Sequence, residues 1–227
     1  MQTVFFDLDN TLYDYDAAHA AAYPAVQRYA EANLGLDAAA FNEAHRAAAR
    51  EMAACTGGNC AAVHNRLIRY QQIVESLGKP LVCAVRMAEI YWSTFVAEIR
   101  PFPDAADCLR SFRSAGFRVA IGTNMTADYQ FAKLEALGLL QLIDLLVSSE
   151  EANAEKPDPR FFALCAKRAR CAPAACVFVG DNLEGDALAA QRAGMQAVWL
   201  NRFGAENCGG IRSVSSLHEL ALLIPSL

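Results

Sequence analysis

The stretch VFFDLDNTLYD occupies residues 4–14, close to the N-terminus. Its first three residues are apolar and predict a short buried strand, which delivers Asp7 and Asp9 at its carboxyl end. In an open α/β sheet, ligands bind beyond the carboxyl ends of the strands, so this pair is better placed for chemistry than for packing. Two carboxylates this close repel each other unless a cation, a shared proton or different roles relieve them. An ordinary pair of acidic loop residues is the alternative for this stretch taken alone.

Residues 15–98 follow this stretch and have the composition of helices, with no strand pattern among them. We expect four helices, at about residues 16–33, 37–54, 61–77 and 80–96. Asp37 is a suitable N-cap for the second of them. Four successive helices between two strands indicate a single inserted bundle, because crossover helices of a sheet would alternate with strands.

From Pro101 onward, apolar runs typical of strands alternate with helical stretches. Strands are expected at about residues 117–121, 143–147, 176–179 and 197–200, with a last helix near residues 215–224. Asp104 is expected to cap the helix before the first of these strands. Such alternation is typical of a parallel, doubly wound sheet. The sequence therefore predicts an α/β protein with a Rossmann-like core of residues 1–14 and 99–227, into which a helical cap domain of residues 15–98 is inserted.

The chain has 227 residues, of which 54% are hydrophobic and 20% charged, and this composition excludes an intrinsically disordered protein. No apolar run approaches the roughly 20 residues of a membrane-spanning helix, and the N-terminus lacks the basic region of a secretory signal. The net charge of −5 argues against general nucleic-acid binding. None of the eight cysteines forms a C-x-x-C spacing, so we expect reduced thiols. These features predict a soluble cytoplasmic monomer or homodimer that binds neither membranes nor nucleic acid.

Polar side chains follow three of the predicted strands, and a lysine lies in a loop of the same part of the chain. They are Asp7, Asp9, Thr123, Asn124, Lys156, Asp181 and Asp186. Hard oxygen ligands with one ammonium suit a Mg²⁺ ion that has a phosphate group beside it. Zinc is not favoured, because no histidine or cysteine stands at these strand ends.

Four motifs occur in order along the chain. They are DLDNTLYD at residues 7–14, GTN at 122–124, EKPDPRFF at 155–162 and GDNLEGD at 180–186. In order and spacing they resemble the four motifs of the haloacid dehalogenase superfamily, in the subgroup with a helical cap inserted between the first and second motifs. The resemblance covers the whole predicted core and the position of the insertion.

This resemblance implies a role for each matching residue. Asp7 is expected to be the nucleophile that takes the phosphoryl group as an aspartyl-phosphate. Asp9 is expected to be the general acid and base, with its backbone carbonyl binding the metal. Thr123 would hold a phosphoryl oxygen, Lys156 would neutralise charge on the nucleophile and the phosphate, and Asp181 would bind Mg²⁺ together with the first two acids. A carboxylate nucleophile divides a very slow reaction into two easier ones, and the leaving alkoxide then needs a proton from a second acid.

Further residues are candidates without a settled role. Asp186 is the second acid of the last motif, and it binds the metal directly or lies in the outer shell. Asn124 is a candidate substrate-binding residue in the second motif. In the insertion, His64 and Arg66, together with Arg69, are candidates for contacting the leaving group, since arginine suits planar or anionic groups. A solvated helix face is the alternative for these three.

The resemblance predicts a Mg²⁺-dependent phosphatase for a small phosphorylated metabolite, such as a nucleotide, a sugar phosphate or phosphoglycolate. A dehalogenase is not favoured, because halide departs without a proton and enzymes of that type lack the acid that this chain has at Asp9. A phosphonatase is not favoured either, since it uses a cap lysine, whereas residues 15–78 contain none and Lys79 is expected to lie in a turn. The alternatives are a phosphomutase with the same nucleophile and acid, and a catalytically silent protein that binds a phosphorylated metabolite.

Overall fold

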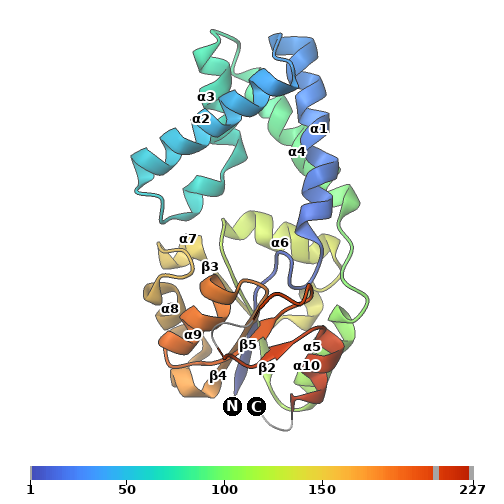
Figure 1. Cartoon of the computed structure of the whole chain (residues 1–227), viewed down its shortest axis with the longest axis vertical. Helices are drawn as coiled ribbons and strands as arrows, with labels where there is room; N and C mark the ends of the chain where they lie inside the picture. Colours follow the sequence, from blue (N-terminus) through green and yellow to red (C-terminus); the bar gives the residue numbers. More distant parts are fainter. Residues whose placement is uncertain (1, 207–209, 225–227) are drawn as a thin grey trace. The chain divides into compact units, whose positions relative to one another are not determined.

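A computed structural model of the chain describes residues 2–206 and 210–224, and Figure 1 shows it coloured along the sequence. The chain forms two compact units. The sheet unit consists of Met1–Asp14 and Arg100–Leu227, and the helical unit consists of Tyr15–Ile99. The chain therefore leaves the sheet unit directly after the acidic stretch that follows the first strand.

Six parallel strands form the sheet in the order β3-β2-β1-β4-β5-β6. They are β1 (Thr3–Phe6), β2 (Arg118–Thr123), β3 (Leu145–Ser148), β4 (Cys176–Gly180), β5 (Gln196–Leu200) and β6 (Ser213–Val214). This arrangement confirms the predicted α/β fold with a parallel sheet, and the five predicted strands lie within two residues of their expected bounds. The two residues of β6 were not predicted, because so short a run carries no periodic pattern.

Helices and short helical turns connect these strands. They are α5 (Ala105–Ser114), α6 (Ala127–Ala136), η2 (Leu140–Leu142), α7 (Ser149–Ala152), α8 (Pro159–Ala169), η3 (Pro173–Ala175), η4 (Leu183–Leu188), α9 (Ala189–Arg192) and α10 (Leu217–Leu222). Asp104 precedes α5 as predicted, but the prediction that its side chain caps this helix is wrong. Asp104 Oδ2 accepts hydrogen bonds from the backbone N–H groups of Leu217 (2.9 Å) and His218 (3.1 Å), so it binds the first turn of α10 instead, a helix whose N-cap is Ser216.

Alternate residues of β1 face opposite sides of the sheet. Phe5 belongs to a buried core with Phe162 of α8 and Ala190 of α9. Phe6 contacts Phe112 of α5 edge to face, with ring centroids 5.6 Å apart. Figure 1 accordingly shows α8 and α9 on one side of the sheet, with α5 and α10 on the other. Burial on both faces explains why this strand is an uninterrupted apolar run in the sequence.

The helical unit contains four α-helices and one 3₁₀ turn. They are α1 (Tyr15–Leu34), α2 (Ala38–Thr56), η1 (Ala61–His64), α3 (Arg66–Ser76) and α4 (Val82–Glu98). Asp37 caps α2 as predicted, because its carboxylate accepts a hydrogen bond from the backbone N–H of Ala40 (2.8 Å). The prediction of one helix over residues 61–77 is wrong, since the chain breaks at Asn65. The Asn65 side chain caps α3 by accepting a hydrogen bond from Ile68 N–H (3.2 Å).

Seven of the eight cysteines lie within the described residues, and all seven carry free thiols, as expected. Cys208 lies outside the described residues. Among the helices of residues 2–206 and 210–224, none has the length and apolar character to cross a membrane.

Candidate active site

The carboxyl ends of the three central strands bring the polar residues of separate motifs together. Asp7 follows β1, Thr123 ends β2 and Asp181 follows β4. Because β1 pairs with both β2 and β4, these positions are neighbours at one edge of the sheet. A single pocket there is lined by Asp7, Asp9, Thr123, Asn124, Lys156, Asp181, Asn182, Gly185 and Asp186. The seven predicted site residues of the sheet unit therefore all lie in one pocket.

Lys156 joins two acids of this pocket. Its Nζ lies 2.6 Å from Asp7 Oδ1 and 2.6 Å from Asp186 Oδ1, and its side chain is 6% exposed. Burial alone would lower the pKa of Lys156, but the carboxylates of Asp186 and Asp7 outweigh it and raise this pKa above its usual value. Asn124 supports the arrangement, since its Oδ1 accepts a hydrogen bond from the backbone N–H of Lys156 (2.9 Å).

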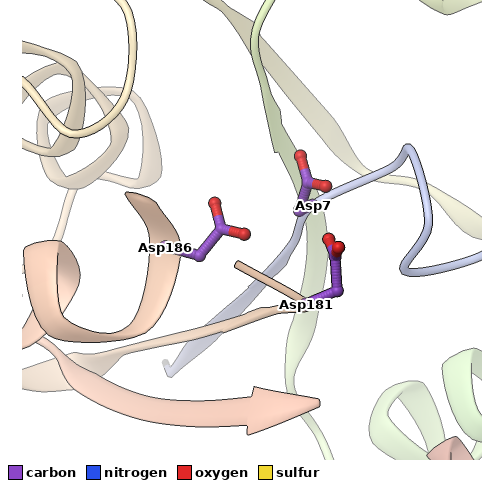
Figure 2. Close-up of side chains that lie close together, drawn as sticks. All are labelled: Asp7, Asp181 and Asp186. Carbon is purple, nitrogen blue, oxygen red and sulfur yellow. The ribbon is translucent and has the colours of Figure 1, made fainter. Parts of the chain in front are cut away.

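Asp7, Asp181 and Asp186 form an acidic cluster. Each offers a carboxylate oxygen within 4.8 Å of the others, and Figure 2 shows the three side chains turned toward a common space. Burial raises the pKa of Asp7 well above its usual value, and the neighbouring acids raise it further despite the opposing effect of Lys156. Burial, followed by the charge of Asp186, raises the pKa of Asp181 to about 6. The cluster therefore holds more negative charge than its surroundings offset.

This donor set fits a divalent cation. Three carboxylates and one ammonium leave a surplus of two negative charges, which equals the charge that such an ion supplies. All of the ligand atoms are hard oxygens, the type that Mg²⁺ prefers. The Thr11 hydroxyl orients Asp181. It donates a hydrogen bond to Asp181 Oδ1 (3.2 Å) and accepts one from the backbone N–H of Asp181 (3.1 Å).

The position of Asp186 depends on the glycine that ends β4. Asp186 is 2% exposed and lies in the π-helical segment η4, where its Oδ2 accepts a hydrogen bond from Asn182 N–H (3.1 Å). A Cβ atom at Gly180 would overlap the Asp186 carboxylate. The glycine of the last motif is therefore required because this side chain passes directly over the backbone.

Asp9 lines the same pocket but has different partners. Lys133 Nζ lies 2.9 Å from both Asp9 carboxylate oxygens, and the Tyr13 hydroxyl donates to Asp9 Oδ1 (2.5 Å). The Asp9 side chain is not one of the three that form the acidic cluster. The two acids of the first motif thus occupy distinct electrostatic environments.

Lys133 and a second residue of α6, Gln130, were not predicted as site residues. Gln130 Nε2 donates to Thr123 Oγ1 (2.7 Å) and to the backbone carbonyl of Asn124 (2.6 Å), which holds these two residues of the second motif in place. Gln130 is 0% and Lys133 is 1% exposed. Their spacing of three residues puts them on one helix face, but polar residues so spaced usually face solvent, so the sequence signal is weak.

His64 and Arg66 lie in the helical unit, on η1 and at the start of α3. The alternative of a solvated helix face is wrong for Arg66, which is 8% exposed and donates a hydrogen bond to the Tyr15 hydroxyl (2.6 Å). A role for His64 or Arg66 in binding substrate stays a prediction.

The sequence of this chain is similar to those of known hydrolases. The sequence profile of the haloacid dehalogenase-like hydrolases matches residues 1–194. Ribulose-1,5-bisphosphate 5-phosphatase from Halopiger xanaduensis is 37% identical over 198 residues, covering 86% of this chain and 82% of that protein. Glyceraldehyde 3-phosphate phosphatase from Methanothermobacter thermautotrophicus is 33% identical over 204 residues, covering 88% of this chain and 86% of that protein.

The fold has close counterparts among solved structures. The crystal structure of 2-haloacid dehalogenase from Pseudomonas syringae matches with a TM-score of 0.78 at 25% identity, over 100% of this chain and 99% of that chain. The architecture is thus shared by enzymes that expel halide and by enzymes that release phosphate, so the choice between these reactions depends on the side chains in the pocket.

Proposed function

This chain belongs to the haloacid dehalogenase-like hydrolases, and we propose that it is a magnesium-dependent phosphatase that hydrolyses small phosphate monoesters through an aspartyl-phosphate on Asp7. The observation that carries the proposal is the separate pairing of two acids. Asp7 contacts Lys156 at 2.6 Å, whereas Asp9 contacts Lys133 at 2.9 Å. Such a site offers a nucleophile and a separate carboxyl group for proton transfer, and ester hydrolysis needs both.

Asp7 attacks the phosphorus atom, the bond to the leaving oxygen breaks, and the phosphoryl group is transferred to the carboxylate. Lys156 offsets the repulsion between the anionic nucleophile and the anionic phosphate, because its ammonium lies beside Asp7 in a buried position. Thr123, held by Gln130, offers its hydroxyl to a phosphoryl oxygen. Lys156 is fixed before the substrate arrives, whereas the Thr123 hydroxyl donates to the backbone carbonyl of Asn124 (3.2 Å) and has to rotate toward the phosphoryl oxygen.

Asp9 transfers protons in both halves of the reaction. In its protonated form it gives its proton to the leaving alkoxide, and the carboxylate that results then takes a proton from the water that hydrolyses the aspartyl-phosphate, which restores the acid. Lys133 and Tyr13 hold the Asp9 carboxylate from two sides and restrict its rotation. We therefore assign proton transfer to Asp9, and to Lys133 the orientation of the Asp9 carboxylate.

Magnesium would be bound by Asp7, Asp181 and Asp186, with the backbone carbonyl of Asp9 as a further ligand. When bound, the ion would supply positive charge to the transferring phosphoryl group. Lys156 occupies one oxygen of Asp186, so this acid both orients the lysine and contributes to the charge that attracts the ion.

A dehalogenase with this fold is the competing function, and Asp9 argues against it. Halide leaves without a proton, so a dehalogenase has no use for a carboxylate held in the pocket by its own lysine. A phosphomutase and a silent metabolite-binding protein keep the same residues. Phosphate release separates them from a phosphatase, because a mutase returns the phosphoryl group to a sugar and a silent protein releases none.

The substrates of the two phosphatase relatives suggest small sugar-type phosphates for this chain. The test is release of inorganic phosphate from a panel containing ribulose 1,5-bisphosphate, glyceraldehyde 3-phosphate, phosphoglycolate and a nucleoside 5′-monophosphate, with Mg²⁺ present. We expect turnover of at least one of them. Release of chloride from 2-chloropropionate without any phosphate release would overturn the proposal. A cytoplasmic location and a monomeric or homodimeric state stay predictions.

A further inference from the structure

Two arginines of the helical unit lie among aromatic side chains and face no carboxylate. The Arg66 guanidinium lies 4.0 Å from the ring centroid of Tyr91 and donates to the Tyr15 hydroxyl. Arg69, on the same helix, donates to the backbone carbonyl of Val63. Within the part of the chain that the structure describes, no carboxylate is within ion-pair distance of either guanidinium. Cations withdrawn from water without a counter-ion are costly, so this pair needs an explanation.

Polar atoms beside these arginines also lack partners. Nε of Arg69, the hydroxyl of Tyr70 and Nε2 of His45 are buried and make no hydrogen bond. The rings of His45 and Tyr70 lie 6.1 Å apart, and Tyr70 is 0% exposed. Buried polar groups are nearly always satisfied, so three together indicate a partner that is not part of the helical unit. We call Arg66, Arg69, His45 and Tyr70 the arginine cluster.

The arginine cluster has a surplus of positive charge. Burial, and then the charges of Arg69 and Arg66, lower the pKa of His45 to about 4. His19 responds in the same way, because burial followed by the charge of Arg66 lowers its pKa. Both histidines are therefore neutral near pH 7, and the positive charge comes from the guanidinium groups. A bound anion would offset this charge and accept the unused hydrogen bonds of Arg69 and Tyr70.

We propose that the arginine cluster binds an oxyanion, which is a phosphate or a carboxylate group. Planar guanidinium groups match the geometry of such oxyanions and stay charged at neutral pH. All four residues of the arginine cluster belong to the helical unit, whereas the pocket that contains Asp7 is lined by residues of the sheet unit. The proposed oxyanion site is therefore built from other residues than the candidate active site.

Binding to the arginine cluster can be followed through Trp92, whose ring centroid lies 5.3 Å from the Arg66 guanidinium. The chain has two tryptophans, so Trp199→Phe leaves Trp92 as the sole reporter. Titration of this full-length variant with sulfate at constant ionic strength should change the Trp92 fluorescence saturably. Parallel titrations with inorganic phosphate and with acetate distinguish a phosphate-type from a carboxylate ligand. A response that does not saturate, or that chloride reproduces, would overturn the proposal.

Variants on the same background test which groups bind the anion. Arg69→Gln should weaken sulfate binding by about tenfold or more, since it removes a charged donor. Tyr70→Phe removes a hydroxyl that has no partner in the protein, so it should weaken binding several-fold without lowering the Tm. Arg86→Gln is the matched control, because Arg86 is exposed and pairs with Glu89 on the same helix. Unchanged sulfate affinity in both Arg69→Gln and Tyr70→Phe, with the proteins folded, would contradict the proposal.

Discussion

Lys133 Nζ lies 2.9 Å from each carboxylate oxygen of Asp9, and the Lys133 side chain is 1% exposed. Asp7, two residues before Asp9, pairs with Lys156 instead. Adjacent acids of one motif are thus held by different cations, which relieves their repulsion without a shared proton. A buried lysine paired in this way cannot turn to solvent, so it fixes the direction in which the Asp9 carboxylate points. Lys133 is a positioning residue for the proposed general acid.

Replacement of Lys133 by methionine keeps the apolar stem and removes the charge, so we expect kcat to fall by about 10². The loss should be larger for an alkyl phosphate, whose alkoxide needs a proton to leave, than for p-nitrophenyl phosphate, whose phenolate leaves unaided. Steady-state kinetics on both substrates measure this difference. Lys167→Met, on the exposed face of α8, is the matched control. Equal losses on both substrates would indicate that Lys133 serves only the fold.

Asp7→Asn should abolish turnover, with kcat reduced by at least about 10³, because an amide of nearly the same shape is a poor nucleophile. The substitution also removes one of three clustered carboxylates, so the folded protein should be as stable as the unmodified one. Phosphate release, circular dichroism and thermal unfolding check the two parts. Substantial activity in a preparation shown to be free of other phosphatases would refute the proposed nucleophile.

Residues at strand ends could be predicted from the sequence, whereas those supplied by a helix could not. Asp7, Thr123 and Asp181 each follow an apolar run, and the parallel sheet necessarily brings such run ends together. Lys133 gives no comparable signal, because its burial depends on where α6 packs. Side chains that form hydrogen bonds to residues far away in the sequence were not predicted either, because such contacts depend on how the elements pack. Asp104, which accepts hydrogen bonds from the first turn of a helix more than a hundred residues later, is the clearest example.

The burial of Arg66 in the helical unit could not be predicted from the sequence either. A charged residue at the start of an amphipathic helix is usually exposed, and only the packing of α4 against α3 places Arg66 beside the rings of Tyr91 and Trp92. The break at Asn65 has a local cause, since an asparagine that caps a helix also ends the turn before it. That signal was present in the sequence, but the apolar residues on both sides of it favoured one continuous helix.

Removal of divalent metal should eliminate activity. Chelation by EDTA would leave the surplus negative charge of Asp7, Asp181 and Asp186 without a counter-ion, and the incoming phosphate would be repelled. Added Mg²⁺ should restore the rate, whereas Ca²⁺ should not, because its larger and looser coordination sphere alters the arrangement of oxygens. Metal content by atomic spectroscopy and phosphate release by a colorimetric assay test this together. Full activity in a sample with no detectable divalent metal would contradict the prediction.

His45 should make the protein lose stability as the pH falls. Burial and the charges of Arg69 and Arg66 hold the pKa of His45 near 4 in the folded state, whereas the unfolded chain has a value of about 6.5. Between these values the unfolded state binds more protons, so the free energy of unfolding decreases as the pH is lowered through this window. After allowance for partial exposure, we expect this residue to account for a decrease of about 2 kcal/mol.

The measurement is urea unfolding of the unmodified protein and of His45→Gln at pH 7 and at pH 4.5. The variant cannot be protonated at this position, so its free energy of unfolding should change less between the two pH values, while His218→Gln, on the exposed face of α10, should behave as the unmodified protein. Sulfate should reduce the effect of His45, because an anion in the arginine cluster favours the charged imidazole and brings its pKa closer to the unfolded value. Equal pH dependence in the unmodified protein and His45→Gln would show that solvent or a neighbouring acid already stabilises the charged form.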